Sequence, residues 1–140
     1  MITLQLYEAG DWLKIKDPVE PFAVFDEGKV DEIVARGIAV TAIEDGKSMA
    51  CGGIAFVSES EGNVWVKMSK DCAKQPFKWA RGIREAFGIM VRSIGDLKIS
   101  AYILDNFCKG EKMARLINLK RAGETEEYDG NLYNKYSMVI

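Results

Sequence analysis

Residues 64–104 decide the fold, and they read VWVKMSKDCAKQPFKWARGIREAFGIMVRSIGDLKISAYIL. Hydrophobic and polar residues alternate over 64–68 and again over 97–104, which is typical of half-buried strands. Between them, hydrophobic residues recur every three or four positions from Pro76 onward, which predicts one long amphipathic helix that ends at Gly95. Two strands joined through a helix in this way are expected to be parallel, with a right-handed crossover.

Shorter elements are predicted on both sides of this unit. Asp45-Gly46 suits a type I′ hairpin turn, and the Gly52-Gly53 pair indicates a bulge or a close backbone approach. Gly37 and Gly123 are read as helix stops. The predicted elements are strands at 2–7, 38–43, 49–57 and 64–68, helices at 12–15, 26–36, 76–94 and 108–121, a strand at 97–104 and a last hairpin at 124–139. This order predicts a mixed α/β (α+β) domain, in which a mainly antiparallel central sheet is flanked by helices.

Composition narrows the possible chemistry. The 140 residues fit a single domain at 1–140, with 48% hydrophobic and 29% charged residues, as in folded proteins rather than disordered ones. The chain has no histidine, which excludes a Ser-His-Asp triad, a Cys-His dyad and every histidine-bearing metal site. Cys51, Cys72 and Cys108 form no CxxC motif and are expected to be reduced thiols of a cytoplasmic protein. No signal peptide or membrane span is expected.

The charge of the chain is unevenly distributed. Residues 1–65 carry 12 acidic and 5 basic side chains, whereas residues 66–123 carry 5 acidic and 13 basic ones. The basic part includes Lys74, Lys78 and Arg81, whose spacing places them on one helix face. Cations near a helix N-terminus are unfavourable unless an anion binds there, which favours a phosphate-bearing ligand. The alternative is a solvated polar face opposite the core, and the absence of glycine from 69–77 weighs against backbone binding of a diphosphate.

The element order resembles that of the GNAT (Gcn5-related N-acetyltransferase) superfamily over nearly the whole chain. Residues 101–123 are similar to the family's fourth-helix segment, Asn-x-x-Ala-x-x-x-Tyr-x-x-x-Gly-Phe. If Gly123 takes the place of the glycine, then the remaining pattern positions, in order, are held by Lys112, Arg115, Leu119 and Glu124. The tyrosine that commonly acts as general acid in the family is therefore missing from this position.

The family's cofactor signature, Q/R-x-x-G-x-G/A, is expected directly after the strand 64–68, and here that loop is degenerate. In this respect the chain more closely resembles divergent GNAT-like proteins of tailed phages. The resemblance implies an acyl-CoA-dependent N-acyltransferase with acetyl-CoA or another acyl-CoA as cofactor and an amine as acceptor. It implies cofactor contacts from Met68, Ser69, Lys70, Lys74, Gln75, Lys78 and Arg81. The alternative is a catalytically silent GNAT-fold protein with a structural or interaction role in a phage, located in the virion.

Acyl transfer to an amine needs a group that accepts a proton and a group that donates one. Candidate bases are the turn residues Glu44, Glu59 and Glu61, and candidate acids are Tyr102 and Cys108. No pair stands out from the sequence, so no catalytic residue is assigned. The chain has no histidine and no clustered cysteines, so no metal site is expected.

Nucleic acid is a less favoured anionic partner. Trp65, Trp79, Phe77 and Tyr102 could offer stacking surfaces, but Phe77 is expected on the core face of its helix. The sequence pI of about 5.3 also argues against nucleic-acid binding.

Overall fold

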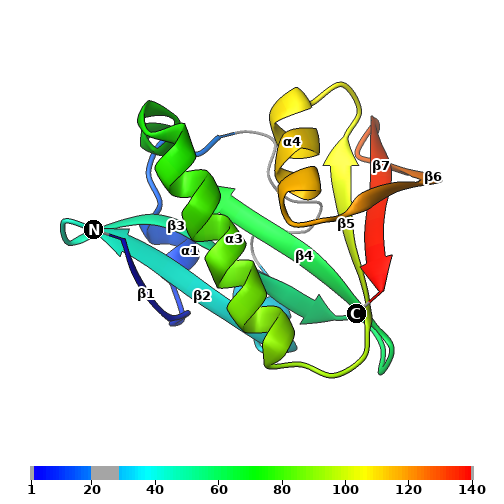
Figure 1. The fold of residues 1–140 in the computed structure, drawn as a ribbon, viewed down its shortest axis with the longest axis horizontal. Helices are drawn as coiled ribbons and strands as arrows, with labels where there is room; N and C mark the ends of the chain where they lie inside the picture. The colour runs from blue at the N-terminus through cyan, green and yellow to red at the C-terminus, as the bar shows by residue number, and fades with distance from the viewer. Residues whose placement is uncertain (1, 20–28, 140) are drawn as a thin grey trace.

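The computed structural model describes residues 2–19 and 29–139 and contains a seven-stranded sheet with the order β1-β2-β3-β4-β5-β7-β6 (Figure 1). The strands β4 and β5 are parallel, and the other neighbouring pairs are antiparallel. The predicted mixed, mainly antiparallel sheet is therefore confirmed. The strands are β1 Thr3–Leu6, β2 Gly37–Glu44, β3 Lys47–Phe56, β4 Glu61–Met68, β5 Lys98–Leu104, β6 Lys120–Tyr128 and β7 Asn131–Val139. The helices are α1 Asp11–Lys14, α2 Val30–Val34, the 3₁₀ helix η2 Lys70–Lys74, α3 Pro76–Arg92 and α4 Cys108–Leu116.

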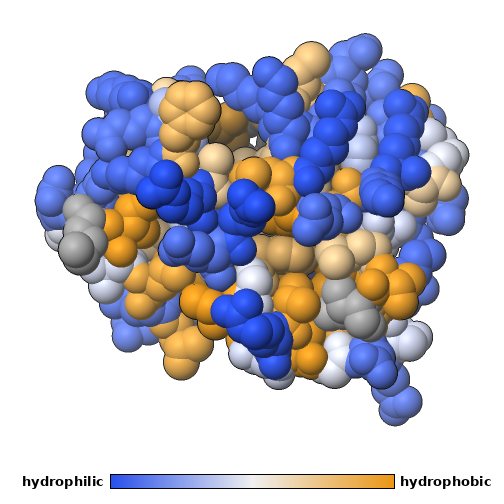
Figure 2. All heavy atoms as spheres, in the orientation of Figure 1, coloured by the Kyte–Doolittle hydropathy of each residue, from blue (hydrophilic) through white to orange (hydrophobic). Residues whose placement is uncertain are grey.

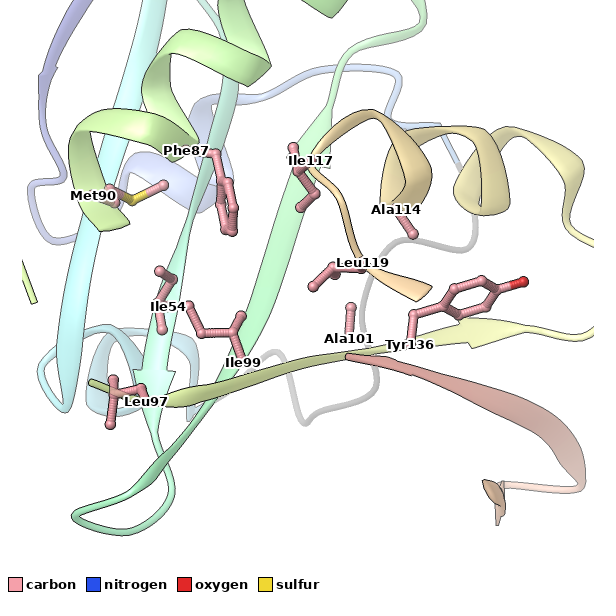
Figure 3. Close-up of a cluster of buried hydrophobic side chains, with 10 residues drawn as sticks. All are labelled: Ile54, Phe87, Met90, Leu97, Ile99, Ala101, Ala114, Ile117, Leu119 and Tyr136. Atoms are coloured by element: carbon pink, nitrogen blue, oxygen red, sulfur yellow. The ribbon is translucent and has the colours of Figure 1, made fainter. Parts of the chain in front are cut away.

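The sheet is covered on both faces. Helices α3 and α4 lie on one face, where ten buried residues form a continuous cluster from Met90 of α3 to Tyr136 of β7 (Figure 3). On the other face, Trp12 of α1 and Val30 of α2 pack with Trp65 of β4. Gly53 confirms the close approach predicted for the glycine pair, because a Cβ at this position would overlap the carbonyl of Ile38 on β2.

The helix α4 is shorter than predicted. It ends at Leu116 rather than at 121, and Gly123 lies inside β6, at the bulge where the register with β7 shifts. The stop is Asn118, which has a left-handed φ of 69°. The N–H of Leu119 donates to the carbonyl of Ala114 at 2.9 Å, and the N–H of Asn118 donates to that of Arg115 at 3.0 Å. This is a Schellman motif, and it turns Leu119 into the core, where it is 1% exposed.

Two further predictions are wrong in detail. Gly37 does not stop a helix but begins β2, while residues 26–28 of the predicted helix lie outside the described residues. Phe77 is 86% exposed, although it was expected on the core face of α3. Each helical residue turns by about 100°, so Phe77 and Trp79 point to opposite sides. Trp79 is the one that is buried, against Cys72 and Met49.

Candidate functional site

The parallel strands β4 and β5 diverge shortly after they begin. They are paired at Glu61–Asn63 with Lys98–Ser100, and beyond this point both strands continue without pairing to each other (Figure 1). We call this opening the fork. Strand β5 remains paired with β7 over its full length, and β4 remains paired with β3. The two halves of the sheet therefore part at the pair Asn63–Ser100.

The edge of β4 that faces the fork carries backbone hydrogen-bonding groups. The N–H of Ser69 donates to the carbonyl of Met49 at 2.8 Å, which is toward β3. Successive residues of a strand direct their backbone groups to opposite edges. The N–H and C=O groups of Val64, Val66 and Met68 therefore face the fork.

The end of this edge is occupied by residues 17–19, which we call the strap. The N–H of Val19 donates to the carbonyl of Met68 at 2.8 Å, and the N–H of Lys70 donates to the carbonyl of Asp17 at 2.8 Å. Pro18 and Ser69 form an antiparallel bridge between these two bonds. The strap thus extends the sheet beside the last residue of β4.

A cleft of about 440 Å³ lies where the carboxyl ends of β4 and β5 open. Ligands of α/β proteins bind outside the carboxyl ends of parallel strands, where neighbouring strands part. The cleft is lined on one side by the strap and η2 and on the other by the turn before α4 and its first residues. These lining residues are Val19, Lys70, Ala73, Asn106, Phe107, Cys108 and Lys109. Two lysines make the cleft suited to an anion.

The N–H groups of the loop between β4 and α3 are used within the chain. Ser69 caps η2, because its Oγ accepts from the N–H of Asp71 at 3.2 Å and its carbonyl accepts from the N–H of Cys72 at 3.1 Å. The N–H of Gln75 donates to the carbonyl of Cys72 at 3.2 Å. An anion at this loop would therefore be bound mainly by side-chain cations.

Carboxylates of the chain itself pair with part of the predicted basic stripe. Lys74 lies 3.2 Å from Asp71, and Lys78 is bound to Glu44. The bond from Lys78 lowers the pKa of the Glu44 carboxyl, so Glu44 is a poor proton acceptor. Arg81 is exposed on α3.

Of the seven residues predicted to bind the cofactor, Lys70 lines the cleft directly. Met68 and Ser69 precede it at the end of β4, and Gln75 is exposed before Pro76. Sequence reasoning missed Asn106 and Lys109, although both follow the carboxyl end of a predicted parallel strand.

A second polar group lies on the sheet face away from α3. Ile99 and Ala101 belong to the cluster under α3, so Ser100 and Tyr102 point to the opposite face. Tyr102 lies directly across from Lys135 of β7 in the register, and Lys135 is 8% exposed and 3.4 Å from Glu124. Burial opposes the charge on Lys135, but interactions with Tyr102, Glu124 and Glu61, including the hydrogen bond to Glu124, outweigh it and raise the pKa of the ammonium. We call these four residues the Lys135 cluster.

Two residues that the sequence suggested separately both influence Lys135. Glu61 was a candidate base and Tyr102 a candidate acid, and both act electrostatically on Lys135 beside the closed end of the fork. Ser100 lies between them on the same face, and its buried Oγ has no hydrogen-bond partner. Glu59, by contrast, is exposed in the turn before β4.

The burial of the cysteines and tryptophans bears on two alternatives, a cysteine as catalytic acid and a surface that stacks on nucleic-acid bases. Burial raises the pKa of the Cys51 thiol to about 12 and that of Cys72 to about 11, so neither is a thiolate at neutral pH. Cys108 is exposed and lines the cleft. Trp65 and Trp79 are 5% and 4% exposed, so neither offers a surface for base stacking.

Two other features, a metal site and a membrane-spanning helix, are absent from residues 2–19 and 29–139. No group of three or more Cys, Asp or Glu side chains there could hold a metal ion. No helix in these ranges is long and apolar enough to cross a membrane.

Comparison with solved structures identifies the architecture. A putative phosphinothricin N-acetyltransferase superposes with a TM-score of 0.74 at 13% identity, covering 100% of this chain and 99% of that one. A Bacillus subtilis acetyltransferase in complex with CoA gives a TM-score of 0.71 at 10% identity, covering 100% of this chain and 99% of that one. The chain has the GNAT fold. The ribosomal-protein-S18-alanine N-acetyltransferase of Escherichia coli gives 0.68 at 14% identity, covering 100% and 94%. No protein-family model and no curated protein matches the chain.

The GNAT fold corrects the alignment of the fourth-helix motif. The glycine of that motif follows the helix, and in this chain the left-handed residue after α4 is Asn118, not Gly123. Counting back from Asn118 places Ala114 at the tyrosine position and Gly110 at the alanine position. Gly110 is buried against Phe107, where a Cβ would be 2.7 Å from a ring carbon. The tyrosine is absent in either alignment, so α4 supplies no phenol.

Proposed function

We propose that this protein is an acyl-CoA-dependent N-acyltransferase, which transfers an acetyl or other acyl group directly from CoA to an amine. The observation that carries the proposal is the fork between β4 and β5 with the lysine-lined cleft at its mouth. Structures similar to this chain are named as acetyltransferases, and among them are one with acetyl-CoA bound and one named for spermidine. A GNAT fold alone does not determine activity, so the site has to support it.

The residues present fit an acyl-CoA. Lys70 and Lys109 would hold its phosphates in the cleft, and the backbone groups of Val64 and Val66 would hydrogen-bond the amides of its extended arm. The other residues that sequence reasoning assigned to the cofactor, Lys74, Gln75, Lys78 and Arg81, would add positive potential from the start of α3. Bound acyl-CoA supplies a thioester, the activated acyl group of the reaction.

Transfer forms a C–N bond and breaks a C–S bond, so the amine loses one proton and the leaving thiolate gains one. Within the Lys135 cluster, the Glu61 carboxylate accepts the proton of the amine and the Tyr102 phenol donates one to the thiolate. The ammonium of Lys135 stabilises the negative charge that Tyr102 acquires in doing so. Tyr102 would thus act as the general acid, because α4 has no tyrosine at the position that commonly supplies it.

The proposal includes a cytoplasmic location, which the buried, unpaired Cys51 and Cys72 favour. A phage origin, with a virion location, rests on the sequence resemblance to phage GNAT-like proteins.

Two measurements test the function. Calorimetric titration with CoA is expected to give a saturable heat, and Lys70→Glu should abolish or strongly weaken it while leaving the melting temperature unchanged. Release of free thiol from acetyl-CoA is then followed with a panel of amines. Release that depends on the amine supports an enzyme. Binding without release indicates a catalytically silent CoA-binding protein, and absence of binding at millimolar CoA contradicts the proposal.

A further inference from the structure

An apolar cavity of about 80 Å³ lies between α3 and the sheet. Its walls are hydrophobic side chains and glycines from β1 to β4, α3 and α4. Folded cores are normally packed to the density of organic crystals, so an empty space of this size is unusual. The lining residues include Val40, Ala50, Gly82, Ile83, Ala86 and Phe87.

The cavity adjoins the fork. Val64 and Val66, whose backbone groups face the fork, are also part of its wall, and Met113 and Ile117 of α4 close it on the far side. Figure 2 shows hydrophobic side chains at the surface between α3 and α4, flanked by hydrophilic ones. The cavity therefore borders the residues of β4 whose backbone groups would bind the arm of the cofactor.

The chemistry of the wall restricts what can enter. Its side chains offer no charged group, so a polar or charged ligand would lose its hydration without gaining partners. An apolar cavity of about 150 Å³ holds one benzene molecule, so about 80 Å³ suits a chain of roughly three carbon atoms.

We infer that this cavity receives the acyl chain of the donor, and that the preferred acyl group is a short apolar one, longer than acetyl. The inference rests on the proposed function and specifies its substrate class. A propionyl or butanoyl chain would fill the space beside Val64 and Val66, whereas acetyl would leave most of it empty.

Calorimetry with acyl-CoAs of increasing length tests this on the wild-type chain. Each added methylene from acetyl to butanoyl is expected to tighten binding by about fourfold, the effect of burying one methylene. 3-Hydroxybutanoyl-CoA has an acyl chain as long as that of butanoyl-CoA but carries a hydroxyl group. It should therefore not bind more tightly than acetyl-CoA. If CoA and acetyl-CoA bind but butanoyl-CoA binds no tighter, the inference is wrong and the proposed function stands. If none of them binds, both are wrong.

A variant that fills the cavity gives the second test. Ala86→Leu adds three carbon atoms inside it, so acetyl-CoA should bind as before while the gain for butanoyl-CoA is lost. Ala80→Leu makes the same change on α3 at a residue outside the lining, and it should keep the gain. If Ala86→Leu does not fold, Gly82→Ala is the milder choice, because its Cβ would meet only a terminal carbon of Ile2, at 3.3 Å. A gain that persists in the filled variants would overturn the inference.

Discussion

The N–H of Val19 hydrogen-bonds the carbonyl oxygen of Met68 at 2.8 Å, on the edge of β4 that faces the fork. Val64 and Val66 present their backbone groups on the same edge, closer to the closed end. An extended ligand that adds to this edge can pair with Met68 only if it displaces Val19 of the strap. The strap and such a ligand therefore compete for the end of β4.

Replacing Val19 by proline removes the N–H donor and should weaken the strap. We expect the free energy of unfolding to fall by about 1 kcal/mol, the value of one hydrogen bond, because the Met68 carbonyl loses its partner. CoA should bind a few-fold more tightly, because it no longer displaces an intact strap. Val19→Ala keeps the N–H and is the matched control. Weaker binding by Val19→Pro than by Val19→Ala would mean that the strap is part of the binding surface and not a competitor.

Glu61 and Glu59 provide a direct test of the proposed proton acceptor. Glu61 belongs to the Lys135 cluster, whereas Glu59 is exposed in the turn two residues earlier. Loss of a general base lowers turnover by roughly 10²-fold or more, so Glu61→Gln should show such a fall in kcat at saturating acyl-CoA. Its affinity for CoA should be unchanged, and Glu59→Gln should match the wild type. Equal activity of the two variants would exclude Glu61 as the base.

The sequence predicted most of the sheet because each strand and α3 carry a local periodic signal. The end of α4 was misplaced because glycine is the commonest left-handed residue after a helix, and the chain uses Asn118 instead. The helix is terminated by Asn118 rather than by Gly123 because Leu119 is then buried in the core. This is a tertiary effect, which no local pattern in the sequence indicates. Phe77 was misplaced for the same reason, since Trp79 competes with it for the core and is the one buried.

The sequence predicted only part of the candidate site, because the rest depends on contacts between residues far apart in the chain. Lys70 was identified from its place after a predicted strand, and Glu61 and Tyr102 from their chemistry. Lys135 joins them only because β7, rather than β6, pairs with β5. Val19 reaches the end of β4 from far away in the sequence, and no local pattern indicates that pairing.

Asp11 should make stability depend on pH at acid values. Burial alone would raise the pKa of its carboxyl, but bonds from the N–H of Glu8, the Thr41 hydroxyl at 2.7 Å and Lys14 outweigh burial and lower it. A group with a lowered folded-state pKa stabilises the protein above its unfolded pKa, near 3.8, and this stabilisation is lost as the pH falls through the folded value.

Asp11→Asn should therefore cost about 2 kcal/mol at pH 7, measured by urea unfolding, because charge-assisted hydrogen bonds are lost. The difference from the wild type should shrink as the pH is lowered below about 4, because the carboxyl group becomes protonated first in the unfolded chain and, at still lower pH, in the folded one. Asp45→Asn is the control, since Asp45 is exposed in the hairpin turn and asparagine tolerates its φ of 52°. A cost that stays constant from pH 7 to pH 2.5 would show that the charge of Asp11 does not stabilise the fold.

Lys70 and Lys74 distinguish a ligand-binding cation from one that the chain itself neutralises. Lys70 lines the cleft, whereas Lys74 is 78% exposed and lies 3.2 Å from Asp71. Lys70→Gln is expected to weaken CoA binding about fivefold, roughly 1 kcal/mol for a partly solvated charge pair, and to reduce the dependence of the affinity on salt. Lys74→Gln should change the affinity by less than about twofold, because its ammonium already has a carboxylate partner. Equal losses in the two variants would mean that the start of α3 acts as a diffuse positive surface, and that the cleft beside Lys70 is not where the phosphates bind.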